Sequence, residues 1–356
     1  MHDCNARRIF SSRYEASLKQ SIIVFLAAFH TVAAAAEPAL RDPGMTKPVF
    51  EVGARYWYST GTLRTSLSNP GDWGGSTLDY TDLNASSLET FFRGERSGFV
   101  LKGFMGLGMI TSGTFRDKDY YRLAGGMITW SDTTSNINAG SATDGSRLVY
   151  GALDLGYRGV PFARYPGIRL GGFAGLTYWN EVLDAYGMIA NPVDDRAGEA
   201  IAAINSHLEQ FGGEEVPSFE PGEVAVPFAN RLIRNDGLWF GPRIGAEFAI
   251  DLGNGLGLSG EAAFLPFLFL KADDSHFFRR PPFPNFLARG AGMGAQLQLV
   301  ATWRIDESWE VGVGGRYWYA SADRDDRAPV PSVHGSDRKD FVNWRYGAFA
   351  QASYRF

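Results

Sequence analysis

The sequence predicts an all-β fold, namely a ten-stranded antiparallel transmembrane β-barrel with long extracellular loops. The chain of 356 residues has 43 glycines and 14% aromatic residues, yet its mean hydropathy is only −0.16. After Glu37 no segment approaches the roughly eighteen consecutive apolar residues of a membrane-spanning helix. Short segments alternate apolar and polar residues instead, which is the period of a β-strand with two unlike faces.

The N-terminal segment predicts export. Lys19 precedes the apolar run "SIIVFLAAF" (21–29), and Ala34 and Ala36 form a small-residue cleavage site before Glu37. This layout is typical of a signal peptide, and the apolar run is too short to span a bilayer as a helix. We therefore expect residues 1–36 to be a signal peptide and 37–356 the barrel. The single cysteine, Cys4, lies in the part that would be removed, so we expect no disulfide.

The last segment shows the membrane-strand pattern most clearly. In "NWRYGAFAQASYRF" (343–356) the even positions are apolar, with aromatic residues at both ends, and the odd positions are mostly polar. That is the pattern of a strand with one face toward lipid and one toward a lumen. A C-terminal Phe356 with Tyr354 two positions earlier also resembles the end of outer-membrane barrel proteins. We therefore expect the protein in a bacterial outer membrane, in contact with its lipid.

Similar segments recur along the chain. We predict ten strands, at roughly 50–67, 77–94, 98–115, 146–158, 167–186, 238–251, 256–273, 290–305, 308–321 and 341–356. An even number of antiparallel strands can close without a free edge, which a bilayer requires.

The predicted connections alternate between short and long. Short turns lie at 94–98, 159–167, 252–255 and 305–308, and long links at 68–76, 116–145, 187–237, 274–289 and 322–340. Short periplasmic turns and long outer loops are typical of such barrels. The longest link contains "DRAGEAIAAINSHLEQF" (195–211), which predicts a short surface helix.

Composition and motif spacing exclude several function classes. The chain has 39 acidic against 34 basic residues, so a nucleic-acid partner is not expected. The histidines His207 and His334 have no zinc-site spacing, and no cofactor or metal is predicted. A large pore is disfavoured because the lumen of a ten-stranded barrel is mostly filled by side chains.

Two short motifs lie at the outer ends of predicted strands that are nearly opposite in a ten-stranded ring. "FRDKDYY" (115–121) contains Asp117 and Asp119, and "LKADDSHFFRRP" (270–281) contains Asp274 and His276. Residues two apart on an extended chain share a face. A carboxylate holds an imidazole in one tautomer and makes it a better base, and two close carboxylates titrate as a coupled pair. Water between the two pairs is therefore a candidate nucleophile for a peptide carbonyl.

These segments resemble the omptins, a family of outer-membrane endopeptidases built on a ten-stranded barrel. "RDKDYY" is similar to the family's Asp-x-Asp motif and "DDSHFF" to its Asp-x-His motif, and the hairpin at 240–264 is similar as well. The resemblance implies catalytic roles for Asp117, Asp119, Asp274 and His276. Through "TWSDTTS" (129–135) it implies a substrate-binding role for Asp132. It also implies peptide or protein substrates and lipopolysaccharide as a candidate activating lipid.

The sequence departs from the omptin pattern in the pocket for a basic substrate residue. The family's two pocket acids fall near Gly61 and at Ala272, with Asp273 as the neighbouring candidate for substrate binding. Cleavage after Arg or Lys is therefore not expected. The family's lipopolysaccharide-binding positions fall around Leu176, Tyr178 and Asn180, none of them basic, and Arg279 and Arg280 are alternative ligands for lipid phosphates.

Strict alternation raises a conflict about the direction of the two pairs. Asp117 is in phase with Phe99 and Leu107, and Asp274 with Leu256 and Phe264, which are the apparent lipid-facing residues. A bulge at the glycines of the third strand or at Pro266 would reverse the phase. Without it both pairs face outward, which favours the alternative function of a non-catalytic barrel with a structural, adhesive or surface-binding role.

Overall fold

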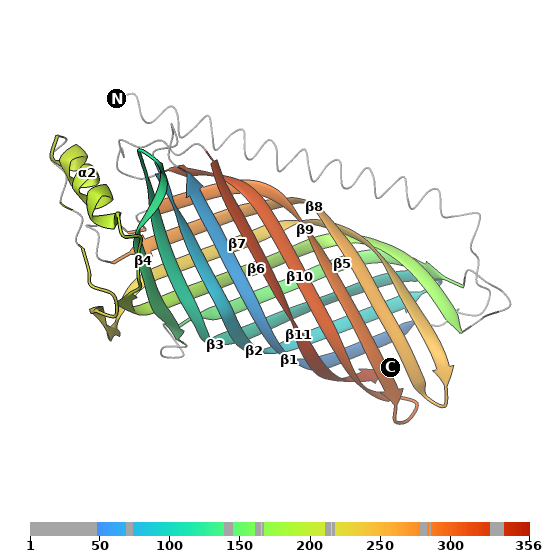
Figure 1. The fold of residues 1–356 in the computed structure, drawn as a ribbon. Coiled ribbons are helices and arrows are strands. Elements are labelled where there is room, and N and C mark those ends of the chain that lie inside the picture. The colour runs from blue at the N-terminus through green and yellow to red at the C-terminus, as the bar shows by residue number, and fades with distance from the viewer. Residues whose placement is uncertain are drawn as a thin grey trace.

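The chain forms one closed antiparallel sheet with a single described helix at one end (Figure 1). The computed structural model describes residues 48–68, 74–138, 145–160, 165, 167–210, 215, 218–277, 283–284, 286–327 and 338–356. The predicted signal peptide lies outside these residues. The strands are β1 (Val49–Ser68), β2 (Gly74–Arg96), β3 (Phe99–Leu123), β4 (Gly126–Asn138), β5 (Arg147–Gly159), β6 (Ile168–Ala190), β7 (Val224–Gly253), β8 (Leu256–His276), β9 (Phe286–Arg304), β10 (Trp309–Arg327) and β11 (Arg338–Arg355).

The eleven strands occupy ten places in the ring, which confirms the predicted ten-stranded barrel. Strand β3 pairs with β5 along its first half and with β4 along its second half, and β6 pairs with both from the other side. Strands β4 and β5 therefore share one place, one at each end of the barrel. Pairing of β1 with β11 closes the ring.

Several strands extend further at the outer end of the barrel than predicted. The link at 116–145 was expected to be a loop, but β3 continues to Leu123 and β4 returns along it to Asn138. Strand β7 likewise begins at Val224 rather than at 238. These extensions carry polar residues on both faces, so they lack the lipid-facing alternation by which a membrane strand is found in a sequence. Pairing in hairpins beyond the apolar band holds them extended.

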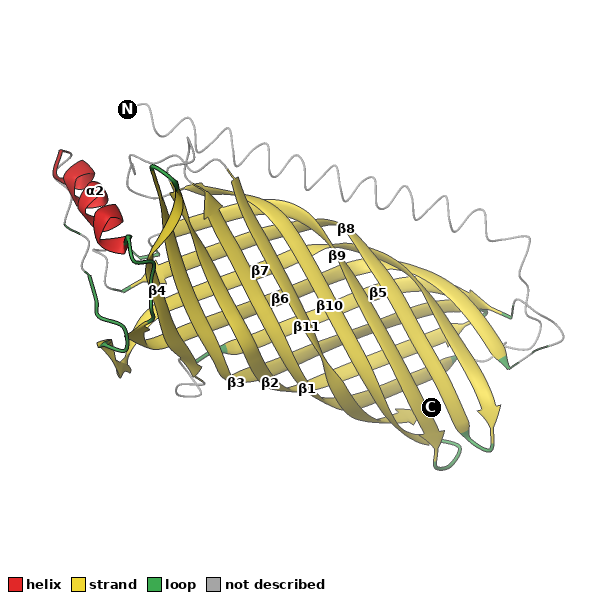
Figure 2. Cartoon of the chain, viewed as in Figure 1, coloured by secondary structure: helices red, strands yellow, loops and turns green. Residues whose placement is uncertain are grey.

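The short β2–β3, β7–β8 and β9–β10 turns lie together at one end of the barrel (Figure 2). The β7–β8 turn contains Gly253, Asn254 and Gly255, all with positive φ, as a tight hairpin requires. The helix α2 (Ala197–Gln210), predicted at 195–211, lies at the opposite end with the β3–β4 hairpin. In the described part of the chain, no helix is long and apolar enough to cross a membrane.

The alternation predicted for the last strand is confirmed. On β11 Asn343, Arg345 and Phe349 are buried in the lumen, and Tyr346 is exposed on the outside. Exposed apolar side chains form a band on the outer wall, including Leu101, Met105, Leu107, Phe264, Phe267, Leu297, Leu299 and Val313. An apolar outer band around a partly polar interior is the arrangement of an outer-membrane barrel.

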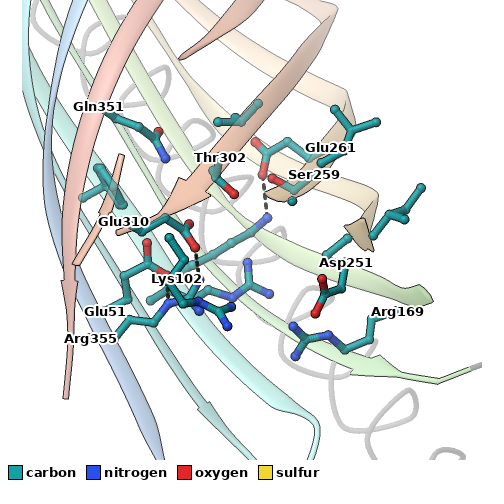
Figure 3. A pocket seen from close by; sticks show the side chains of 18 of the residues that line it. Glu51, Lys102, Arg169, Asp251, Ser259, Glu261, Thr302, Glu310, Gln351 and Arg355 are labelled. Atoms are coloured by element: carbon teal, nitrogen blue, oxygen red, sulfur yellow. Dashed lines mark hydrogen bonds and ion pairs between the residues drawn. The ribbon is translucent and has the colours of Figure 1, made fainter. Parts of the chain in front are cut away.

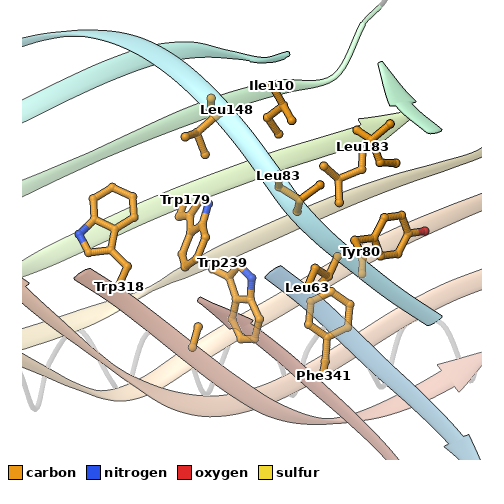
Figure 4. Packing of buried hydrophobic residues seen from close by; sticks show 14 of the residues in the cluster. Leu63, Tyr80, Leu83, Ile110, Leu148, Trp179, Leu183, Trp239, Trp318 and Phe341 are labelled. Atoms are coloured by element: carbon orange, nitrogen blue, oxygen red, sulfur yellow. The ribbon is translucent and has the colours of Figure 1, made fainter. Parts of the chain in front are cut away.

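Packed side chains fill the middle of the lumen. Trp57 and Trp318 have ring centroids 5.0 Å apart, and Tyr150 lies within 5.3 Å of both. Leu63, Leu83 and Phe341 lie in the cluster nearer the outer end (Figure 4). This core separates the outer mouth of the barrel from its short-turn end.

A polar cavity of about 360 Å³ opens at the short-turn end (Figure 3). Several of its charges are paired: Lys102 lies 2.6 Å from Glu261 and 2.7 Å from Glu247, and Arg355 donates to Glu310 at 2.9 Å. The cavity lies at the far end of the barrel from the predicted catalytic residues, and the Lys102–Glu261 pair joins β3 to β8 across the lumen.

Candidate active site

A bulge in β8 turns the Asp-x-His pair into the barrel. Leu265 pairs with Gly294 of β9 but Leu268 pairs with Gly292, so one extra residue of β8 lies between them. Pro266 is in this step and has no N–H to donate to a neighbouring strand. Leu265 and Leu268 are both buried, although strict alternation would place them on opposite faces. The side chains that point into the lumen are therefore the odd-numbered ones before this step and the even-numbered ones after it. The expected phase conflict is thereby removed for Asp274.

Strand β3 changes phase in the same way. Ile110 and Phe115 are both fully buried, although strict alternation would put them on opposite faces. The pairing with β2 shifts twice in this region, around Asn84, and Asp82 adopts φ 53° next to it. Aspartate tolerates this left-handed conformation better than most residues. Asp117 and Asp119 follow Phe115 in phase and therefore point to the lumen side.

Asp274 and His276 form a bonded pair. The Nε2 of His276 lies 3.2 Å from Oδ2 of Asp274, and Asp274 is only 9% exposed. The ring of Phe286 packs edge-on against the imidazole, with centroids 5.0 Å apart. When Nε2 donates to the carboxylate, Nδ1 of the neutral imidazole is left as a proton acceptor.

The Asp117–Asp119 pair is half-buried at the same end of the barrel. Ser76 of β2 donates from Oγ to Oδ1 of Asp117 at 3.0 Å. The two aspartates stand two residues apart on one face of β3, so their Cα atoms are about 7 Å apart. Strand β3 lies four places from β8 around the ring in one direction and six in the other. The structure therefore places the two pairs on facing walls of the outer mouth.

Asp132 lies on the other face of the β3–β4 hairpin. It is opposite Lys118 in the pairing, and it accepts hydrogen bonds from Arg116 (2.6 and 2.8 Å) and from Asn191 (2.8 Å). Burial opposes its ionisation, but the bonds from Arg116 and Asn191 outweigh burial and lower the pKa of the carboxyl below its ordinary value. The substrate-binding role stays a prediction, and the observed contacts tie Asp132 to the hairpin instead.

Asp273 also points away from the lumen. It alternates with Ala272 and Asp274 on β8, and its carboxylate binds Arg289 at 2.8 Å and Lys271 at 2.9 Å. Because side chains alternate along a strand, Asp273 and Asp274 cannot line the same face. Its predicted substrate-binding role therefore remains a prediction that this orientation does not favour.

The residues that replace the omptin pocket acids and lipid-binding residues have the following surroundings. A Cβ atom on Gly61 would lie 2.9 Å from Nη2 of Arg345, whose guanidinium is buried and paired with Glu181. Ala272 is buried on the lumen face of β8. Leu176 and Tyr178 are exposed on the outer wall, and Asn180 donates to Asp236 at 2.7 Å. Arg279 and Arg280 lie outside the described residues.

Sequence reasoning missed two polar neighbours of the site. Ser76 binds Asp117, and Asn235 of β7 is paired directly opposite Asp274. The β7–β8 register steps out between Phe240 and Ile244, so counting back from the turn at 252–255 does not give this partner. Within the described ranges, no group of three or more His, Cys, Asp or Glu side chains is arranged to hold a metal ion.

No protein-family model matches the sequence, and no curated protein matches it. The crystal structure of the outer membrane protease OmpT from Escherichia coli does match in three dimensions, with a TM-score of 0.63 and 14% identity over 90% of this chain and 99% of that chain. The outer membrane protein OprG from Pseudomonas aeruginosa gives a TM-score of 0.29 and 9% identity over 88% and 97% of the two chains. The likeness to OmpT shows that this chain has an omptin-like outer-membrane barrel fold.

Proposed function

We propose that the protein is an omptin-like endopeptidase of the bacterial outer membrane. One observation carries the proposal: after two phase changes, an Asp–His pair and an Asp–Asp pair point inward on facing walls of the outer mouth. Either motif alone would be an ordinary pair of rim charges. Both together, on the lumen side and above a packed core, support the proposal of a catalytic site that faces the outside of the cell.

The chemistry follows from the positions of the groups. His276, oriented by Asp274, accepts a proton from a water molecule whose oxygen bonds to the peptide carbonyl carbon. The proton then passes to the leaving amine as the C–N bond breaks. A protonated member of the Asp117–Asp119 pair donates a hydrogen bond to the carbonyl oxygen, which carries the negative charge of the intermediate. A preorganised donor of this kind stabilises the transition state more than the ground state.

We propose uncharged substrate residues next to the cleaved bond. The residue that precedes Asp274 on the lumen face of β8 is Ala272, which has no charge. The space beside Gly61 is occupied by the guanidinium of Arg345. The nearby carboxylate of Glu181 is already bonded to Arg345 and Asn343. Neither position therefore offers a carboxylate to a lysine or arginine side chain, and that of Glu181 is already paired.

Lipopolysaccharide is the lipid partner we propose. Lys271 and Arg289 are 50% and 40% exposed on the outer wall, above the apolar band. Cations at this level are placed to bind the phosphates of an outer-leaflet lipid.

The proposal is tested by peptide cleavage with the refolded protein in the presence of lipopolysaccharide. A mixed-sequence peptide library is incubated with wild type, Asp117→Ala, His276→Ala and the control Asp79→Ala, which changes an aspartate on the outer face of β2. We expect cleavage by wild type and the control and its loss, by about 10²-fold or more, in the other two.

A second function is favoured by one observation. The predicted substrate acids Asp132 and Asp273 are both engaged with basic neighbours on the opposite face, as expected for a barrel with a structural, adhesive or surface-binding role. A folded wild type that cleaves no peptide in the library would contradict the protease and favour this alternative.

A further inference from the structure

Asn235 is a buried polar residue beside the catalytic pair that the chemistry above does not use. It lies on the lumen face of β7, in phase with Ile233 and Trp239, and is 1% exposed. Its position in the sheet is directly opposite Asp274. Side chains of directly opposite residues lie on the same face, with Cβ atoms about 5 Å apart.

Its carboxamide has no partner among the described residues. Neither Nδ2 nor Oδ1 of Asn235 makes a hydrogen bond, and Oδ1 of the adjacent Asp274 makes none either. Buried polar groups in folded proteins are nearly always bonded, so three such atoms on two directly opposite residues require an explanation. Asn343 differs, because its Nδ2 already donates to Glu181.

The next residue of β7 on the lumen face leaves room beside the carboxamide. Gly237 follows Asn235 on the same face and has no side chain, and a Cβ atom there would lie 3.7 Å from Oδ1 of Asn235 and 3.9 Å from the ring of Phe341. The backbone carbonyl oxygen of Glu181 lies 3.8 Å from the same Cβ position, and neither it nor the Phe341 ring makes a hydrogen bond to the carboxamide.

We propose that Asn235 binds the main chain of the peptide substrate next to the cleaved bond, with Nδ2 donating to a substrate carbonyl and Oδ1 accepting from a substrate N–H. This inference rests on the proposed endopeptidase function. A carboxamide offers one donor and one acceptor side by side, as a peptide group does. Main-chain binding at this position holds the carbonyl beside Asp274 and does not depend on substrate sequence.

The first test measures steady-state kinetics on a peptide cleaved by wild type. Asn235→Ala is compared with Asn230→Ala, the same change at an exposed position of β7. We expect Asn235→Ala to lower kcat/KM by about tenfold or more, the loss for one buried hydrogen-bonding pair, and Asn230→Ala to leave it unchanged. Folding of both variants is checked by thermal melting in detergent.

The second test separates binding from a structural effect. Peptides in which one amide at a time is replaced by an ester, which removes a substrate N–H, are given to both enzymes. We expect one ester next to the cleaved bond to reduce kcat/KM for wild type but to have little further effect in Asn235→Ala. Equal penalties in both enzymes at every position, or equal kinetics of the two alanine variants, would overturn the role of Asn235. Absence of wild-type cleavage would instead overturn the endopeptidase function and this role with it.

Discussion

A buried carboxylate joins two arginines in the middle of the lumen and provides a sharp test of how the barrel is stabilised. The side chain of Glu89 is 0% exposed and accepts from Nη1 of Arg55 at 2.5 Å and from Nη1 of Arg316 at 2.6 Å. Both guanidinium groups are themselves buried and bridge β1, β2 and β10 through this one carboxylate. Their other hydrogen-bond acceptors are the neutral side-chain oxygens of Gln298 and Gln351.

Replacing Glu89 by glutamine keeps its shape but removes the charge. Two buried cations are then left with neutral partners, and removal of one member of a buried ion pair typically costs about 3–5 kcal/mol. We expect Glu89→Gln to lower the free energy of unfolding by about that amount. Because two arginines lose their counter-charge, the upper half of the range is expected.

The assay is equilibrium unfolding in urea of the protein in phospholipid vesicles. Glu199→Gln serves as control, because Glu199 pairs with Arg196 on the exposed surface of α2 and solvent screens that pair. The control is expected to show no measurable change. A loss below about 1 kcal/mol for Glu89→Gln would refute the reasoning, since the arginines would then be compensated by water in the lumen.

Three further predictions concern the mouth and its supports. Ala272→Asp adds a lumen-facing carboxylate, so we expect the kcat/KM ratio of a Lys peptide over its Leu counterpart to rise by about tenfold, and an unchanged ratio would contradict the proposed preference. Because the pKa of Asp132 is lowered in the folded protein, its contribution to hairpin stability is complete above its ordinary value of 3.8 and is lost as pH falls through the lowered pKa. Hydrogen exchange of β4 should therefore accelerate over that pH range in wild type, and Asp132→Asn should abolish the step. A Cβ atom on Gly241 would lie 1.9 Å from the carbonyl oxygen of Phe267 beside the β8 bulge. Gly241→Ala should therefore lower the free energy of unfolding in urea by about 1–3 kcal/mol. An unaltered urea midpoint would show that this close approach is dispensable.

Much of the architecture could be predicted because the bilayer imposes a simple pattern on the chain. Each lipid-crossing strand must alternate outward apolar and inward residues, and β11 does so from Asn343 to Phe356. Short glycine-containing turns, such as Gly253–Asn254–Gly255, mark the strand ends. Above the apolar band that pattern disappears, and the paired extensions of β3, β4 and β7 were therefore predicted as loops.

The site shows where sequence reasoning reached its limit. The types and spacing of Asp117, Asp119, Asp274 and His276 were visible in the sequence, and they suggested the reaction. Their direction was not, because one extra residue in a strand reverses every side chain after it. The glycines and prolines of a strand do not by themselves identify which residue forms the bulge.

The sequence by itself determined the class of fold, the order of its strands and the residue types at its mouth, since all three follow from local periodicity and spacing. Only the tertiary structure decided that the two pairs face the lumen, that Asp132 and Asp273 face away from it, and that Asn235 lies opposite Asp274. Each of these depends on the register between strands distant in the chain, which is fixed by packing across the whole ring and not by any one segment.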